Sequence, residues 1–183
     1  METQTAFKEN ILASICGGAR QYKAVFLDYE YEICSKAFSA QGSYIISATK
    51  SNFLHLTGVN TNLTAEQFFD KAFDRSLTVD DFDFCKKGQS EKIVKGSVRR
   101  KVKFLPCLAR IFSATTLVEE GFEKGRISCT LAVSEDSFTL GFIAVPKCRP
   151  KTLLKGNLLK NPCKIDAIRR RRRGEETFED FLP

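Results

Sequence analysis

The 183-residue sequence has no tryptophan, one methionine and one histidine, and it lacks a long hydrophobic run. The missing tryptophan and the scarce methionine exclude little. The longest uncharged stretches are far too short to cross a bilayer, and the N-terminus has no apolar block of the kind that marks a secretory signal. We therefore expect a cytoplasmic protein that does not contact membranes.

Closely spaced cysteines are also missing, although the sequence contains seven cysteines. No two of them lie two to four residues apart, the spacing of zinc knuckles and redox motifs. Their number is odd and most have apolar neighbours, which is typical of buried, reduced cysteines. We expect no disulfide framework, no metal site and no cofactor. The seven are Cys16, Cys34, Cys85, Cys107, Cys129, Cys148 and Cys163.

Positive charge is present but unevenly distributed. Segment 86–110 holds nine basic side chains and one acidic side chain, and segment 147–173 holds eleven and one. Because the whole chain carries +7, the remainder carries −11. Basic segments beside an acidic body suit a polyanion that binds on one side, so we expect RNA or DNA as the partner.

The candidate nucleic-acid-binding residues come from both basic segments. A solvated helix face and a solubilising tail are the plain alternatives for the two segments. A membrane-surface helix is a weaker rival for segment 86–110, because its β-branched apolar stripe fits a domain core. The candidates are Lys92, Lys95, Arg99, Arg100, Lys103, Arg110, Arg169, Arg170, Arg171, Arg172 and Arg173.

The first half of the chain alternates between helical and extended patterns. Apolar spacing predicts a helix over 5–20 that ends at Gly17-Gly18. Period-two alternation predicts a strand over 22–34, and a second strand follows over 43–49. A short helix that Ser51 caps and Gly58 ends is expected next. Thr64 to Gln67 form a capping box that opens another helix.

In the second half of the sequence, the apolar spacing predicts a long basic helix over 91–112, which Pro106 kinks or splits. Strands are expected over 114–120, 126–134 and 137–145, with Glu135-Asp136 at a hairpin tip. Pro146, Pro150 and Gly156 then predict irregular chain. The order predicts an α+β fold, with N-terminal and central helices packed on a small antiparallel sheet. We expect one domain over 1–160 and a basic C-terminal tail over 161–183.

Three carboxylates, Asp28, Glu30 and Glu32, share one face of the first predicted strand. Such a group is able to bind a divalent metal, as a metal-dependent nuclease requires. No lysine stands at the spacing that would complete such a site, so we favour a solvated strand face.

The segment Phe53-Leu-His-Leu-Thr-Gly-Val59, the later segments 65–69 and 77–82, and the Pro-Lys-x-x-Pro-x-Thr-Leu-Leu segment over 146–154 resemble a known family. They are similar to the phage-type branch of the Barnase–EndoU–colicin–RelE nuclease superfamily of mobile genetic elements. The resemblance covers roughly residues 25–155. It implies a small α+β domain and metal-independent cleavage of RNA.

In such cleavage a general base takes the 2′-hydroxyl proton, the oxygen attacks the adjacent phosphate, and cations stabilise the developing charge. The resemblance implies His55 as base or acid and Thr57 as a phosphate ligand. Arg149 and Thr152 are further catalytic candidates, with Lys103 or Arg110 from the basic helix.

Two interpretations of this site stay open. A lone histidine between Leu54 and Leu56 is more often structural than catalytic, and such sites usually use more than one titratable group. The alternative function is therefore a non-catalytic counter-defence (anti-CRISPR) protein. It would bind and inhibit a host RNA-guided nuclease that is loaded with nucleic acid.

Overall fold

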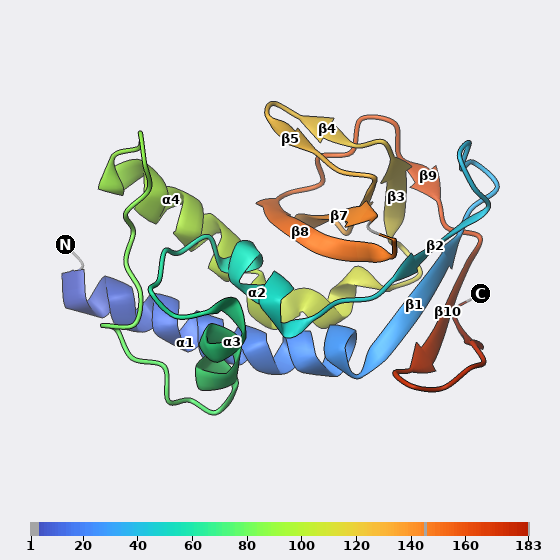
Figure 1. Cartoon of the computed structure of the whole chain (residues 1–183). Coiled ribbons are helices and arrows are strands. Elements are labelled where there is room, and N and C mark those ends of the chain that lie inside the picture. The colour runs from blue at the N-terminus through green and yellow to red at the C-terminus, as the bar shows by residue number, and fades with distance from the viewer. Residues whose placement is uncertain (1–3, 145, 183) are drawn as a thin grey trace.

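The structure is a computed structural model that describes residues 4–144 and 146–182. Figure 1 shows the helices gathered at one end of the molecule and a curled sheet at the other. The α+β prediction is confirmed, but the predicted small antiparallel sheet is wrong. The main sheet has nine strands in the order β11-β10-β1-β2-β8-β7-β6-β3-β9, and β2 and β8 run parallel.

The helices come mostly from the first two thirds of the chain. None of those in the described part of the chain is long and apolar enough to cross a membrane. They are α1 (Gln4–Tyr22), the π-helical turn η1 (Lys23–Leu27), α2 (Lys50–Thr57), α3 (Ala65–Phe73), α4 (Glu91–Val102) and the 3-10 helix η2 (Leu105–Ile111).

The strands come from two separate parts of the chain. The first part supplies β1 (Tyr29–Cys34) and β2 (Ser43–Ile46), and the second supplies the others. These are β3 (Leu117–Glu120), β4 (Glu123–Lys124), β5 (Ile127–Ser128), β6 (Leu131–Ser134), β7 (Phe138–Ala144), β8 (Cys148–Lys155), β9 (Cys163–Lys164), β10 (Ala167–Arg172) and β11 (Glu179–Leu182).

Helix α1 runs further than the sequence predicts. Gly17-Gly18 does not end it; a Cβ at Gly18 would lie 2.4 Å from the Cβ of Leu105, so this glycine lets η2 pack against the helix. The predicted strand over 22–34 is wrong in its first half. Tyr22, Val25 and Phe26 are buried at helical spacing, and the strand begins only at Tyr29.

Four local predictions are confirmed. The capping box of Thr64 opens α3, and Gly58 ends α2 in a left-handed conformation with a φ of 78°. The 91–112 helix is split as its proline suggested: α4 ends at Val102, and η2 begins with Pro106 in its first turn. Strands β6 and β7 form the hairpin expected around Glu135-Asp136.

The last third of the chain is more regular than the sequence suggests. Strand β8 forms where Pro146 and Pro150 indicated irregular chain, and a register shift in its pairing with β7 accommodates Lys151 between Pro150 and Thr152. Segment 161–183, which we expected to be a tail, supplies β9, β10 and β11. Strand β10 pairs with β1, because arginines of one strand meet carboxylates of the other.

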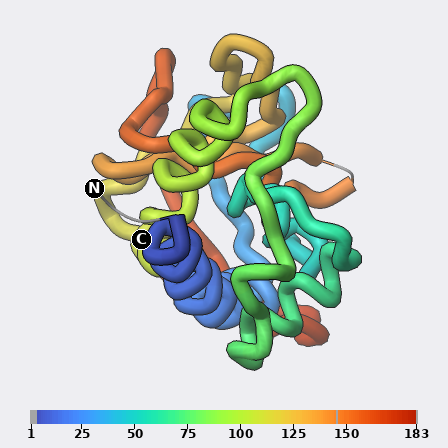
Figure 2. Tube along the Cα trace, turned by 90° about the vertical axis from the view of Figure 1, so that its left-hand side faces the viewer, coloured from blue at the N-terminus to red at the C-terminus, as the bar shows by residue number. Residues whose placement is uncertain are grey.

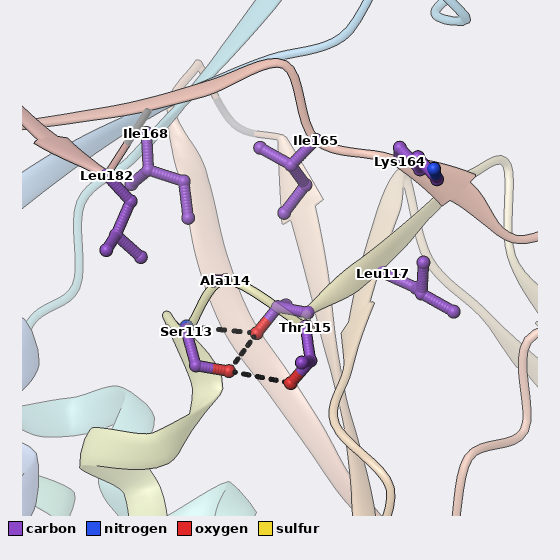
Figure 3. A pocket seen from close by; sticks show the side chains of 9 residues that line it. Ser113, Ala114, Thr115, Leu117, Lys164, Ile165, Ile168 and Leu182 are labelled. Atoms are coloured by element: carbon purple, nitrogen blue, oxygen red, sulfur yellow. Dashed lines mark hydrogen bonds between the residues drawn. The ribbon is translucent and has the colours of Figure 1, made fainter.

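The curl of the sheet brings its two edges together. A pocket of about 310 Å³ lies at this seam, lined by residues 113–117 and by side chains of β9, β10 and β11 (Figure 3). Its polar groups satisfy one another: the Ser113 hydroxyl lies 3.3 Å from that of Thr115 and 3.1 Å from that of Thr116. The seam therefore has the character of a structural cavity.

Candidate nucleic-acid interface

Four arginines of the run 169–173 lie on β10, where alternate side chains meet the carboxylates of β1, and Arg173 directly follows the strand. Arg171 donates two hydrogen bonds to Glu30 at 2.9 and 2.7 Å, and Lys147 bonds the same carboxylate at 2.8 Å. Glu30 is only 5% exposed. Burial alone would raise its pKa, but the hydrogen bonds from Lys147, Ser47 and Arg171 outweigh burial and lower the pKa to about 2.

The other arginines of the run also make internal contacts. Arg173 donates to the carbonyl oxygens of Leu27 at 3.0 Å and Ala48 at 2.7 Å, so it caps the end of the α1–η1 helix. Arg170 lies over the rings of Tyr29 and Phe181, with its guanidinium carbon 4.9 and 4.3 Å from their centroids. These contacts tie β10 and β11 to the rest of the sheet.

The remaining two arginines of the run are exposed, as Arg173 is. Arg169 pairs with Glu32 at 3.4 Å and with Asp180 at 3.3 Å, while Arg172 lies 5.9 Å from the Tyr29 ring. The carboxylates Glu30 and Glu32, considered above as metal ligands or a solvated face, thus serve as partners for arginine. Among the described residues, no group of three or more His, Cys, Asp or Glu is arranged to hold a metal ion.

The basic residues around α4 are arranged differently. Lys95 pairs with Glu91, and Arg110 pairs with Glu135 at 2.7 Å and bonds Ser137. Within the described residues, no ion pair joins the remaining basic side chains of segment 86–110 to a carboxylate. They are Lys86, Lys87, Lys92, Arg99, Arg100, Lys101 and Lys103. This face is therefore free to meet phosphates.

His55 lies on the last turn of α2, at the edge of the α4 surface, and its side chain is exposed. Its neighbours Phe53, Leu56 and Thr57 are buried, so the turn is anchored while the imidazole faces solvent. Within the described part of the chain, the imidazole makes no hydrogen bond or ion pair. The arrangement leaves it available to a ligand.

Lys101 approaches the same end of α2 from α4, and sequence reasoning missed it. Its Nζ lies 3.4 Å from the carbonyl oxygen of His55, and its stem packs on Gly58, where a Cβ would lie only 3.1 Å from Cδ. Burial first, and then repulsion from Lys86, lower the pKa of Lys101 to about 8. The clue in the sequence is its position three residues after Val98 and seven after Val94, at the margin of the apolar stripe.

The other catalytic candidates do not gather around His55. Thr57 is fully buried; its hydroxyl donates to the carbonyl oxygen of Leu54 at 2.8 Å and accepts from the amide of Val59, so it shapes the end of α2. Thr152 is buried, and its methyl group lies beside Gly141, its partner on β7. The next residue, Leu153, points to the other face of the sheet and belongs to the main core.

Arg149 is exposed, and its position opposite Ile143 puts it on the face of the sheet that the buried Phe142 does not occupy. Strand alternation thus gives Arg149 and Thr152 the same face, away from the main core. The site that the structure assembles is His55 and Lys101, with Lys86 close enough to Lys101 to lower its pKa.

A groove between α1 and α4 lies on another side of α4 from Lys101. It has a volume of about 460 Å³ and is lined by Gln4, Phe7, Glu91, Lys92, Lys95, Gly96 and Arg99. Figure 2 looks nearly along α1, with α4 lying above it as in Figure 1. The ring of Phe7 lies 5.9 Å from Nζ of Lys95 and 5.8 Å from the guanidinium carbon of Arg99. Aromatic and basic groups thus meet from segments far apart in sequence.

Comparison with known proteins identifies a family. The family model described as phage-Barnase-EndoU-ColicinE5/D-RelE like nuclease4 matches residues 14–178. This match begins within α1 and ends before β11, so it includes the other helices and the strands from β1 to β10. No curated protein and no solved structure shows significant similarity to the chain.

Proposed function

Because the chain belongs to the phage-Barnase-EndoU-ColicinE5/D-RelE like nuclease4 family, we propose that it is a phage or mobile-element endoribonuclease that needs no metal ion. The family supports a nuclease-like fold and a nucleic-acid substrate. The observation that carries the enzymatic proposal is the approach of Lys101 to the helix end that bears His55, with Nζ 3.4 Å from its carbonyl oxygen. A second titratable group thus lies at the end of α2 that carries the single histidine.

The reaction that this pair is suited to is internal transesterification of RNA. His55 accepts the proton of a 2′-hydroxyl, and the 2′-oxygen attacks the adjacent phosphorus. The bond from phosphorus to the 5′-oxygen breaks, and Lys101 gives that oxygen a proton. The products are a 2′,3′-cyclic phosphate and a 5′-hydroxyl, and one proton has passed from substrate to base and another from acid to product.

The exposed basic residues of α4 have a separate role in this scheme, which is to bind phosphates of the RNA. Arg99, Arg100 and Lys103 are exposed on other sides of α4 than Lys101, and are suited to hold phosphates of the same strand further from the scissile bond. Lys101 is charged below its pKa of about 8 and can then donate a proton. Cleavage should therefore decline as the pH rises through about 8.

The test is cleavage of an end-labelled single-stranded RNA in the presence of a chelator. We expect the wild type to cut it and to leave cyclic phosphate ends. His55→Ala and Lys101→Met should each lower the rate about 10²- to 10⁴-fold, with the affinity for a 2′-O-methyl strand nearly unchanged. Lys101→Arg keeps the charge but cannot give up a proton near neutral pH, so it should be slow as well. Lys36→Met, an exposed lysine on the β1–β2 loop, is the matched control.

An RNA with a good leaving group separates the two roles. A uridine 3′-(p-nitrophenyl) phosphate needs no proton on its leaving oxygen, so Lys101→Met should retain most of its rate on this ester while His55→Ala does not. No cleavage by the wild type on a range of RNAs would contradict the enzymatic proposal. Binding without cleavage would instead support the non-catalytic counter-defence alternative, which a plasmid-interference assay against an RNA-guided nuclease tests directly.

A further inference from the structure

Gly96 stands in the middle of α4, where a glycine weakens a helix relative to alanine. Packing does not require it. A Cβ at Gly96 would meet only a guanidinium nitrogen of Arg100, at 3.9 Å, whereas a Cβ at Gly18 in α1 would collide with Leu105. Helix packing therefore does not explain the glycine at position 96 of α4. This glycine lines the groove between α1 and α4.

The groove has the groups that a single nucleotide would use. The Phe7 ring packs against Phe84, with centroids 5.4 Å apart, and is thereby held in place. The cations of Lys95 and Arg99 lie within 6 Å of the same ring, and Lys92 lines the groove beside them. Aromatic rings and guanidinium planes stack on bases, and Lys92 and Arg99 are suited to neutralise phosphate, whereas Lys95 is already paired with Glu91 of the same groove. A volume of about 460 Å³ is within the range of small-molecule sites.

We propose that the α1–α4 groove is a subsite for one unpaired nucleotide of a single-stranded nucleic acid, with Gly96 leaving room for the ligand to reach the helix backbone. The inference rests on the proposed nucleic-acid-binding function and names its substrate class. A paired base is covered by its neighbours in a duplex and cannot enter such a groove. The subsite therefore favours single strands over duplexes, while the exposed cations of α4 attract both.

The test uses a labelled 12-nucleotide 2′-O-methyl RNA, which cannot be cleaved, and the same strand in a duplex. Gly96→Ala should raise the midpoint of thermal unfolding and yet weaken single-strand binding, because the methyl group removes ligand space while it favours the helix. Gly96→Leu should weaken single-strand binding further. Ser97→Ala, the neighbouring position on the same helix and outside the groove lining, is the matched control and should leave affinity unchanged.

The substitution Phe7→Leu tests independently whether the ring stacks on a base. It keeps apolar bulk against Phe84 but removes the stacking surface, and loss of a base stack lowers affinity by about 5- to 150-fold. Duplex affinity should change less than twofold in each variant. A Gly96→Ala protein that binds the single strand as the wild type does would overturn the subsite, as would equal losses for single strand and duplex.

The probe separates this inference from the proposed enzymatic activity. Binding of an uncleavable strand is measured whether or not the protein cuts RNA, so a catalytically inert wild type leaves the result readable. A wild type that cuts RNA while Gly96→Ala and Phe7→Leu bind normally would overturn the subsite alone. A wild type that binds no single strand would overturn the subsite as well.

Discussion

The two basic segments have similar charge in the sequence, but the structure uses them in opposite ways. On β10, Arg171 pairs with buried Glu30, and Arg173 caps a helix. On α4, Arg99 and Arg100 are exposed, and neither forms an ion pair with a described carboxylate. A run of five arginines is the stronger charge signal in the sequence, yet it is the segment more fully committed to the fold.

The difference shows that the net charge of a segment indicates a ligand-binding surface only if its charged side chains have no partners within the fold. The −11 that we assigned to an acidic body is partly Glu30 and Glu32, which face the arginines of β10. Their attraction holds the C-terminal strands to the sheet and leaves less charge for a ligand. The α4 surface has no comparable set of carboxylates, so its field extends into solvent.

The largest effect should come from breaking the buried cluster of β10. Arg171→Met leaves Glu30 buried with Lys147 as its remaining cation, and removal of one partner of a buried pair costs about 3 to 5 kcal/mol. Urea unfolding should show that loss, with single-strand affinity per folded molecule unchanged. The matched control is Arg100→Met on α4, which should change stability by less than about 0.5 kcal/mol. Equal stability losses in the two variants would contradict the comparison.

Low pH should destabilise the same cluster. The pKa of Glu30 is lowered in the folded protein to about 2 from an ordinary value of 4.5. The stability it contributes is therefore present above about pH 4.5 and is lost as the pH falls toward 2, by roughly 3 kcal/mol in total. Glu30→Gln should be less stable than the wild type at pH 7, and its stability should fall less between pH 5 and pH 3. Parallel pH curves for the two proteins would show that Glu30 does not carry this effect.

Removal of charge from α4 should act on binding rather than on folding. In Lys92→Ala/Arg99→Ala/Arg100→Ala, the slope of log affinity against log salt should flatten by about one unit per lost phosphate contact. Substitution of Arg169 and Arg172 to alanine is the comparison on β10 and should leave the slope nearly unchanged. Fluorescence anisotropy across a salt series measures both slopes. A larger change from the β10 pair would reverse our assignment of the surface.

The smallest expected effect is a change in the free energy of unfolding on substitution of Lys101, and its sign is the informative part. Burial lowers the pKa of Lys101, so its charged form is disfavoured in the fold at neutral pH. Lys101→Met should therefore be slightly more stable than the wild type at pH 7, in contrast to Arg171→Met. Because the wild type gains stability as Lys101 deprotonates, the difference should shrink between about pH 8 and pH 10. A melting temperature that falls in Lys101→Met would contradict this account.

Local signals made part of the fold predictable. The capping box at Thr64, the proline that separates α4 from η2, and the hairpin around Glu135-Asp136 depend on neighbouring residues only. Long-range pairing was the harder part. The alternation over 22–34 suited a strand, but Tyr22 and Phe26 are held by the core in a helical turn. Strand β10 forms because β1, which lies far earlier in the chain, supplies its carboxylates.

The candidate site was predictable to a similar extent. His55 and the α4 cations were found from the motif and from charge, and the structure places them on adjoining elements. Lys101 was missed because its environment is made by Gly58 and the end of α2, which the local sequence around it does not reveal. Phe7 was missed for the same reason, since it reaches the basic groove from the other end of the chain.

Arginine modification by phenylglyoxal tests the central comparison most directly. The readout is the rate at each arginine by mass spectrometry, with and without a saturating 2′-O-methyl single strand. We predict that the strand slows modification of Arg99 and Arg100 several-fold and leaves the rates of Arg169 and Arg172 unchanged. Protection of Arg169 and Arg172 with none at Arg99 and Arg100 would show that the nucleic acid binds β10, and would contradict the account.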